Sequence, residues 1–397
     1  MNSFYRANIF YISAMFLLVA TTCPIFSAHA LTVTSTPISA EDLISRYEKV
    51  GNEGKPIRIL VVPGHEPSSG GAEFLGLKER NMTVYTAEAL VSYLKMDKKI
   101  EPILARDYTS WNETLSVYFA NNWEAIKTFR REHLASMKTA IATGAVVKNQ
   151  GVYHNLAPEE TSVHLFGINK WANENNIDLV IHIHFNDDPD HKAKIEGDNQ
   201  GIVVYIPDGQ YGNATTSRAV ALPVFAILNK YHATSTLKKE DLGITPDQDL
   251  IALGSQNTLL APSILIEYGY IYEPQFWYAP IRRVANTDSA YETYLGIENF
   301  FNSTNLSSKT KASLQFPKKW LSIPASGKHD VSVYLLQKAL AFLGYYPPKN
   351  KDLYECPMTG KVGNCTKQAI VEFQKVYGIK EIGFGVKTRA ELAKILK

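Results

Sequence analysis

Apolar runs alternate along the chain with longer stretches in which apolar residues recur at helical spacing. The run at 57–62 leads into Pro63-Gly64 and predicts a buried strand that ends in a loop. The stretch 79–95 places its apolar residues near helical spacing and predicts a helix. Further strands are predicted at 100–104, 177–185, 201–206 and 264–267, and a further helix at 164–175. This alternation predicts an α/β fold, with a mainly parallel sheet and helices on both of its faces.

An insertion at about 108–160 interrupts this alternation. It is rich in aromatic residues and contains a predicted amphipathic helix at 121–142. The insertion either walls a substrate groove or is a helical elaboration of the fold, and the pattern leaves both interpretations open.

A second, smaller domain is predicted at 329–397. Two helices with apolar periodicity that end in glycine, and a third short helix, favour a small three-helix bundle. Between 301 and 328 the composition changes to Ser, Thr, Asn, Lys and Pro, which is typical of a linker. The α/β domain is therefore expected to occupy 56–300.

The N-terminus carries the features of an export signal. Residues 1–30 contain one basic residue, Arg6, then the apolar stretch 9–20 and the small-x-small sequence Ala28-His29-Ala30. These features predict a secretory signal peptide, followed by an N-terminal extension at 31–55. An uncleaved membrane anchor is the alternative, and in either case the remaining chain is expected to be extracytoplasmic.

Charge and cysteine content narrow the class of protein. The 397 residues include 41 basic and 39 acidic residues, so a general binder of nucleic acid is not indicated. After signal cleavage only Cys356 and Cys365 remain, and their spacing in an exported chain favours a local disulfide. Two thiolates alone do not form a tetrahedral zinc site.

Three polar residues follow strands where an α/β sheet places its active site. His65 follows the first strand, Glu79 begins the first helix of the domain, and His184 lies at the end of the strand predicted at 177–185. Two imidazoles and a carboxylate with an open fourth position form the ligand set of a hydrolytic Zn²⁺ site. Glu267 closes an apolar strand, and because burying a lone carboxylate is costly, we expect it to act as the general base and acid.

Other residues compete for these roles. His182 is expected to point to the opposite face of the strand from His184, and it would be a rival ligand only if the register slips. Glu66 and Glu73 are alternatives to Glu79. We expect structural roles for the remaining candidate histidines, His154, His164, His191 and His232. Asp187, Asp188 and Asp190 form an acidic turn that we interpret as a solvated loop.

Five short motifs occur in a defined order: strand-Pro-Gly-His, Gly-x-x-Glu-Arg-Asn, Arg-Asp, Ile-His-x-Asn-Asp and strand-Glu-x-Gly-Tyr-Ile. Over residues 56–300 this order resembles the zinc-dependent N-acetylmuramoyl-L-alanine amidases of bacterial cell walls. The resemblance implies that His65, Glu79 and His184 bind Zn²⁺ and that Glu267 is catalytic. It also implies hydrolysis of the amide bond between N-acetylmuramic acid and L-alanine in peptidoglycan by a zinc-activated water.

The sequence departs from the family pattern at three places. His182 stands where relatives usually have Ser, the glycines that often follow the first histidine are displaced to Gly70-Gly71, and the insertion at 108–160 is unusual. Because of the insertion, the resemblance leaves the shape of the groove and the choice of substrate open.

The C-terminal region resembles the peptidoglycan-binding domain that accompanies many wall hydrolases. The sequences Leu-Gln, Leu-Gly-Tyr, Thr-Gly-x-x-Gly, Phe-Gln and Gly-x-x-Thr occur there in order. Tyr345 and Tyr346 are expected to be exposed and to be candidates for glycan contact. The resemblance implies a secreted, periplasmic or wall-associated protein whose partner is peptidoglycan, and we expect a monomer.

Two other functions remain as alternatives. One is another zinc peptidase or amidohydrolase of the cell wall. The other is a catalytically silent wall-binding protein or scaffold that keeps the amidase fold. The complete ligand set argues against the silent protein, because a decayed site would be expected to lose a ligand.

Overall fold

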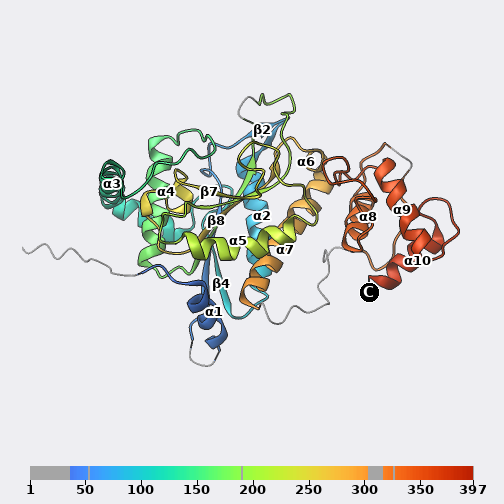
Figure 1. The fold of residues 1–397 in the computed structure, drawn as a ribbon, viewed down its shortest axis with the longest axis horizontal. Helices are drawn as coiled ribbons and strands as arrows, with labels where there is room; N and C mark the ends of the chain where they lie inside the picture. The colour runs from blue at the N-terminus through green and yellow to red at the C-terminus, as the bar shows by residue number, and fades with distance from the viewer. Residues whose placement is uncertain (1–35, 52–53, 189–190, 303–315, 325–326, 397) are drawn as a thin grey trace, which may run out of the picture. The chain divides into compact units, whose positions relative to one another are not determined.

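A six-stranded sheet lies at the centre of the α/β domain in the computed structural model (Figure 1). The structure describes residues 36–51, 54–188, 191–302, 316–324 and 327–396. The strands of this sheet are β1 (Ile57–Pro63), β4 (Ile100–Leu104), β5 (Leu179–Asn186), β6 (Val203–Pro207), β7 (Ile244–Asp247) and β8 (Ser263–Tyr270). A small hairpin pairs β2 (Glu73–Phe74) with β3 (Leu77–Lys78).

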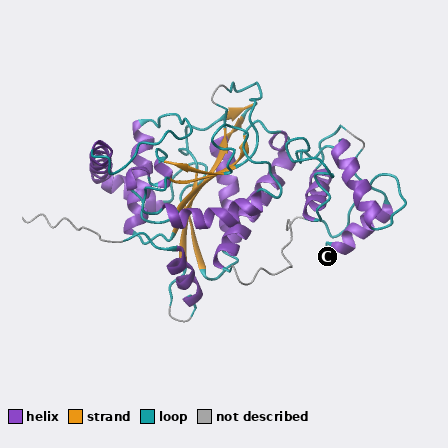
Figure 2. Ribbon diagram, in the orientation of Figure 1, coloured by secondary structure: helices purple, strands orange, loops and turns teal. Residues whose placement is uncertain are grey.

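Helices lie on both sides of the sheet, as the alternation of strands and helices predicts (Figure 2). The helices up to the end of the α/β domain are α1 (Ala40–Lys49), α2 (Glu79–Leu94), α3 (Glu113–Ala142), α4 (Glu159–Glu174), α5 (Ala214–Leu228), α6 (Pro274–Trp277) and α7 (Ala279–Phe301). The C-terminal region contains α8 (Val331–Phe342), α9 (Asn364–Val376) and α10 (Val386–Ile395). None of the helices in the described ranges combines the length and the apolar character needed to cross a membrane.

The strand order is β4-β1-β5-β8-β6-β7. The first four strands run parallel, β6 is antiparallel to β8, and β7 is parallel to β6. The prediction of a mainly parallel sheet is therefore confirmed. Because the first four strands share a direction, the carboxyl ends of β1, β5 and β8 meet at one edge of the sheet.

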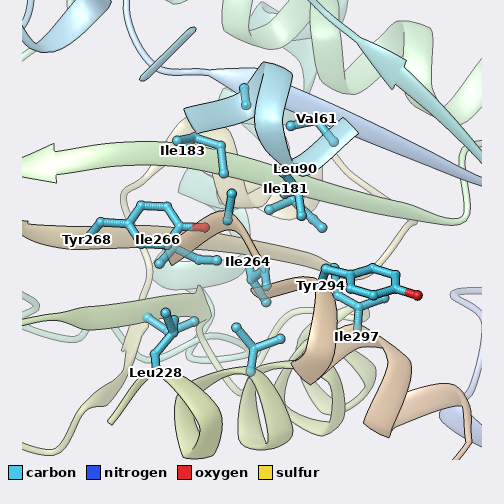
Figure 3. Close-up of a cluster of buried hydrophobic side chains, with 14 of the residues drawn as sticks. Val61, Leu90, Ile181, Ile183, Leu228, Ile264, Ile266, Tyr268, Tyr294 and Ile297 are labelled. Carbon is cyan, nitrogen blue, oxygen red and sulfur yellow. The ribbon is translucent and has the colours of Figure 1, made fainter. Parts of the chain in front are cut away.

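One face of the sheet supports the larger hydrophobic core. Val61 of β1, Ile181 and Ile183 of β5, and Ile264 and Ile266 of β8 point into it (Figure 3). They pack against α2, α5 and α7, which contribute Leu90, Leu228, Tyr294 and Ile297. Burying an aliphatic side chain of this size contributes about 1.5–3 kcal/mol, so these strands and helices hold one another in place.

The predicted insertion covers the opposite face. Its helix α3 begins eight residues before the predicted start at 121, because Asn112 caps it by accepting a hydrogen bond from the backbone N–H of Leu115 at 2.8 Å. Phe119 of α3 and Phe166 of α4 join Leu60 and Val62 of β1 in a second core. The insertion is thus an integral layer of the domain.

The predicted extension at 31–55 contains α1, whose Leu43 and Tyr47 are buried in the larger core. The predicted signal peptide, 1–30, lies outside the described residues. Most of the predicted linker, 301–328, also lies outside them, but Trp320 is described and is buried in the C-terminal core.

The C-terminal region folds into the three predicted helices, α8, α9 and α10. Cys356 and Cys365 form the expected disulfide, with an S–S distance of 2.07 Å. Tyr346 is buried and donates its hydroxyl to the carbonyl of Pro357 at 3.1 Å, so the expectation that it is exposed is wrong. Its ring completes the hydrophobic core of this small domain.

Candidate active site

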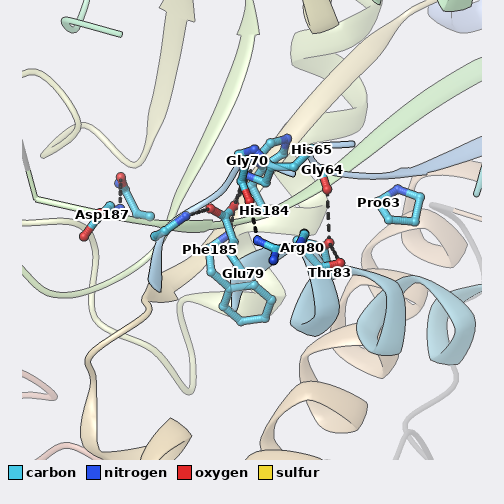
Figure 4. Close-up of polar contacts among 12 residues, drawn as sticks. Pro63, Gly64, His65, Gly70, Glu79, Arg80, Thr83, His184, Phe185 and Asp187 are labelled. Atoms are coloured by element: carbon cyan, nitrogen blue, oxygen red, sulfur yellow. Dashed lines mark hydrogen bonds and ion pairs between the residues drawn. The ribbon is translucent and has the colours of Figure 1, made fainter. Parts of the chain in front are cut away.

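Three neighbouring elements bring His65, Glu79 and His184 together (Figure 4). His65 follows β1, Glu79 is the first residue of α2, and His184 lies in β5. Because β1 and β5 are parallel neighbours, with Pro63 in register with Ile183, the residues at their carboxyl ends come close.

The ligand-type atoms of these three side chains all lie within 4.8 Å of one another. Glu79 Oε1 lies 2.7 Å from His65 Nε2 and 3.1 Å from His184 Nδ1. Within the described ranges, no other group of three or more His, Cys, Asp or Glu side chains has a comparable arrangement. The convergence expected from the sequence is therefore present.

Two glycines allow this close approach. A Cβ atom at Gly64 would lie 2.3 Å from Cε1 of His184, and one at Gly71 would lie 2.9 Å from Cδ2 of His65 and 3.2 Å from Oε2 of Glu79. Gly71 also has a φ of +85°, which favours glycine. The displaced glycine pair of the sequence therefore still lines the cluster.

The cluster holds an ionised carboxylate beside a neutral imidazole. Burial raises the pKa of Glu79, but electrostatic interaction with the imidazoles of His65 and His184 outweighs burial and holds the pKa below its ordinary value. Backbone N–H groups of Phe185 and Ala72 donate to Glu79 at 3.1 and 2.9 Å. Burial lowers the pKa of His184, which favours its neutral form.

Glu267 lies beside the cluster on the adjacent strand. It is the register partner of His184 in the β5–β8 pair, and paired residues share a face of the sheet. Burial, followed by the negative charges of Glu79, Glu240 and Asp187, raises the pKa of Glu267 well above its ordinary value. Its Oε2 atom is buried and has no hydrogen-bond partner in the described part of the chain. A carboxyl group with these properties is suited to proton exchange.

His182 does not join the cluster, although the expectation that it points away from His184 is wrong. Residues two apart in a strand share a face, and Ile183 between them points into the larger core on the other side. His182 lies two residues further from the carboxyl edge, where burial lowers its pKa to about 3 and keeps it neutral.

The alternative carboxylates also have other partners. Glu66 lies 3.1 Å from Nδ1 of His164, and Glu73 lies 3.3 Å from Nη1 of Arg80. The remaining candidate histidines form pairs with carboxylates at 2.6–3.1 Å: His154 with Asp247, His164 with Glu66, His191 with Asp187, and His232 with Glu292.

The acidic turn after β5 is bonded within the protein. Asp187 pairs with His191, and Asp188 accepts hydrogen bonds from the backbone N–H groups of Asp198 and Asn199. Asp190 lies outside the described residues. The interpretation of Asp187 and Asp188 as freely solvated is therefore wrong.

Glu240 is a residue that the sequence analysis missed. It is buried, it contributes to the raised pKa of Glu267, and it accepts hydrogen bonds from Asn186 at 2.9 and 3.1 Å. Hydroxyl groups of Tyr205, Ser235 and Tyr270 also donate to it. In the sequence it sits in a Lys-Lys-Glu-Asp run that is typical of an exposed surface, so no local signal marks it.

Comparison with known families gives two matches along the chain. The N-acetylmuramoyl-L-alanine amidase family matches residues 59–276, more than half of the chain. The chain belongs to this family. The matched range of the amidase family contains the candidate residues His65, Glu79, His184 and Glu267. A putative peptidoglycan-binding domain matches residues 329–382. Cell-wall amidase activity on peptidoglycan thus follows from membership of the amidase family.

Comparison with solved structures also gave matches to amidases. The N-acetylmuramoyl-L-alanine amidase from Clostridium difficile 630 is 16% identical over 64% of this chain and 100% of that chain, with a TM-score of 0.39. The amidase AmiC2 of Nostoc punctiforme is 18% identical over 63% and 99%, with a TM-score of 0.38. The amidase Ami1 from Mycobacterium smegmatis is 15% identical over 63% and 99%, with a TM-score of 0.41. A search of curated proteins gave no match.

Proposed function

We propose that this amidase is zinc-dependent, with His65, Glu79 and His184 as the metal ligands and Glu267 as the general base and acid. The observation that carries the proposal is the convergence of two imidazoles and one carboxylate within 4.8 Å at the carboxyl edge of the sheet. The bond cleaved is the amide between the lactyl group of N-acetylmuramic acid and L-alanine.

The donor set fits a zinc ion. Two imidazole nitrogens and one carboxylate oxygen are the protein ligands of many hydrolytic zinc sites, which keep a fourth position for water. His65 Nε2 is buried and lies 2.7 Å from Glu79 Oε1, yet it makes no hydrogen bond to any described residue. A buried nitrogen lone pair without a hydrogen bond is available to a metal ion.

The proposed chemistry divides between the ion and Glu267. Zinc, when bound, supplies a Lewis acid that polarises a carbonyl oxygen and lowers the pKa of a bound water to about 7. Glu267 accepts a proton from the attacking water as the new C–O bond forms at the amide carbon. It then returns the proton to the amide nitrogen as the C–N bond breaks, which releases a lactyl carboxylate and a peptide with a free N-terminal alanine.

The C-terminal domain has a supporting role in the proposal. The family match at 329–382 favours attachment to peptidoglycan, and an extracytoplasmic, wall-associated location is consistent with the disulfide between Cys356 and Cys365. We expect the protein to act as a monomer.

The test combines zinc analysis with digestion of purified peptidoglycan. Wild type should bind about one zinc per chain and release stem peptides with a free N-terminal alanine, identified by mass spectrometry. Glu267→Gln should retain zinc and lose activity by about 10²–10⁴-fold, because it removes only the proton acceptor. A wild-type protein that carries zinc but releases no such peptides would contradict the proposal and favour a silent wall-binding protein.

A further inference from the structure

Arg106 lies outside the ligand set, but it is one of the largest fully buried side chains of the described chain, with 1% of its surface exposed. It follows β4, which pairs with β1. A buried guanidinium loses its hydration and needs partners for its five N–H donors. Its partners therefore show what this residue does.

The guanidinium holds the backbone just before His65. Arg106 Nε donates to the carbonyl of Pro63 at 3.1 Å, and Nη2 donates to the carbonyl of Gly64. His65 itself has a φ of +68°, a conformation that is unfavourable for a residue with a Cβ atom. Surrounding contacts must impose this conformation, and Arg106 provides two of them immediately upstream.

The same guanidinium also holds the backbone just after Glu79. Arg106 Nη2 donates to the carbonyl of Arg80 at 3.1 Å and contacts the hydroxyl of Thr83 at 3.3 Å. Thr83 in turn donates to the carbonyls of Gly64 and Arg80, at 3.3 and 3.1 Å (Figure 4). One planar group thus joins the segment that carries His65 to the segment that carries Glu79.

Arginine is suited to this task in a way that lysine is not. Every hydrogen bond that Arg106 makes to a described residue goes to a carbonyl or hydroxyl oxygen, and none goes to a carboxylate. The planar guanidinium of arginine holds its N–H donors in fixed directions and can donate to several carbonyls at once, whereas the ammonium of lysine is a single point charge. Burial lowers the pKa of Arg106 to about 10, so the side chain remains charged at neutral pH.

We propose that Arg106 is a positioning residue of the metal site: by joining the backbone beside His65 to the backbone beside Glu79, it fixes the separation of these two ligands. The inference rests on the proposed function, because it assumes that the two residues bind zinc. It predicts that Arg106 controls the affinity for zinc without contacting the ion.

The test measures zinc affinity in the full-length protein by competition with a chelator of known affinity. Arg106→Lys should weaken zinc binding about 10- to 100-fold, the usual effect of losing a residue that orients metal ligands. Arg58→Lys is the matched control. Arg58 lies at the amino end of β1, where it donates to the carbonyl of Asn175, and its replacement should leave zinc affinity unchanged.

A second variant keeps the test decisive if Arg106→Lys does not fold. Thr83→Val has the same shape and removes only the hydroxyl that bridges Gly64, Arg80 and Arg106, so it should weaken zinc binding by about two- to tenfold. Unchanged zinc affinity in folded Arg106→Lys, or in Thr83→Val if the lysine variant is unfolded, would overturn the inference. Failure of the wild type to bind zinc would instead overturn the proposed function, so the two failures are distinguishable.

Discussion

Two buried glutamates among the described residues contact histidines, and they differ in what balances their charge. In the Glu79 cluster, formed with His65 and His184, the carboxylate makes no ion pair with a described lysine or arginine. In the Glu292 cluster, formed with His232 and Lys338, the carboxylate lies 3.0 Å from His232 Nε2 and also pairs with the Lys338 ammonium.

We call the Glu292 cluster the closed cluster, because its charges balance without any added ion, and the Glu79 cluster the open cluster. Glu292 and Lys338 are both fully buried, and the Lys338 ammonium also lies 3.7 Å from the centre of the Tyr231 ring, within range of a cation–π contact. The imidazoles of the Glu79 cluster, by contrast, keep 26% and 17% of their side-chain surface exposed. A buried carboxylate with its own cation has a structural role, whereas one that meets only imidazoles at an accessible edge is suited to the metal ion of the proposed function.

The largest expected effect comes from removing the negative charge of the open cluster. Glu79→Gln should lose bound zinc and lower the rate of peptidoglycan hydrolysis by about 10³-fold or more, because a metal contributes several kcal/mol to transition-state stabilisation. Zinc analysis and the release of stem peptides measure the effect. Glu73→Gln, an exposed neighbour that pairs with Arg80, should keep both zinc and activity. Equal losses in the two variants would contradict this assignment.

Removing the cation of the closed cluster should reduce stability. Lys338→Met leaves Glu292 buried without its ammonium partner, which should lower the free energy of unfolding by about 3–5 kcal/mol in urea titrations. The control is Lys394→Met, which breaks an exposed pair with Glu391 and should cost about 1 kcal/mol or less. Combining Lys338→Met with Glu292→Leu should restore much of the stability, and an unrestored double variant would argue against this account.

Acid should weaken the closed cluster through His232. Burial, with the charge of Lys338, lowers the pKa of His232 from 6.5 to about 3. Between these values the unfolded chain binds one more proton than the folded chain, so the free energy of unfolding falls as the pH drops from 6.5 toward 3. This one histidine contributes about 1.4 kcal/mol per pH unit to the slope. His232→Gln should therefore lose less stability than wild type between pH 7 and pH 5, and identical losses would refute the prediction.

The smallest effect is expected next to the open cluster. Glu66 follows His65 in sequence but pairs with His164, so Glu66→Gln should cost about 1 kcal/mol of stability. Its zinc content, measured alongside Glu79→Gln, should match wild type. Loss of zinc in Glu66→Gln would contradict this prediction and favour Glu66 as a metal ligand.

The open cluster was predictable from the sequence because His65 and His184 lie at the ends of apolar runs, and Glu79 begins a stretch with apolar residues at helical spacing. The apolar runs that form β1, β5 and β8 end near His65, His184 and Glu267, and parallel strands bring such ends to one edge. The error about His182 came from misjudging the strand period, since residues two apart share a face.

The closed cluster was not predictable, and neither was its helix α7. Buried residues lie on most sides of α7 and include Asn286 and Glu292, so its sequence has no apolar stripe to mark it. The helix α5 was also missed; it begins with a polar stretch, Thr215 to Arg218, and carries Pro223 inside it. In both cases a distant segment of the chain sets the burial, and local periodicity cannot report it.

The left-handed backbone of His65 places stability and the proposed metal binding in opposition at one position. A residue with a Cβ atom costs about 1–2 kcal/mol there relative to glycine. Selection for a more stable fold alone would thus favour glycine at this position, and the proposed metal binding would favour histidine. A lineage that abandoned wall cleavage would be expected to lose this imidazole early, and its descendants would be slightly harder to unfold than their active ancestor.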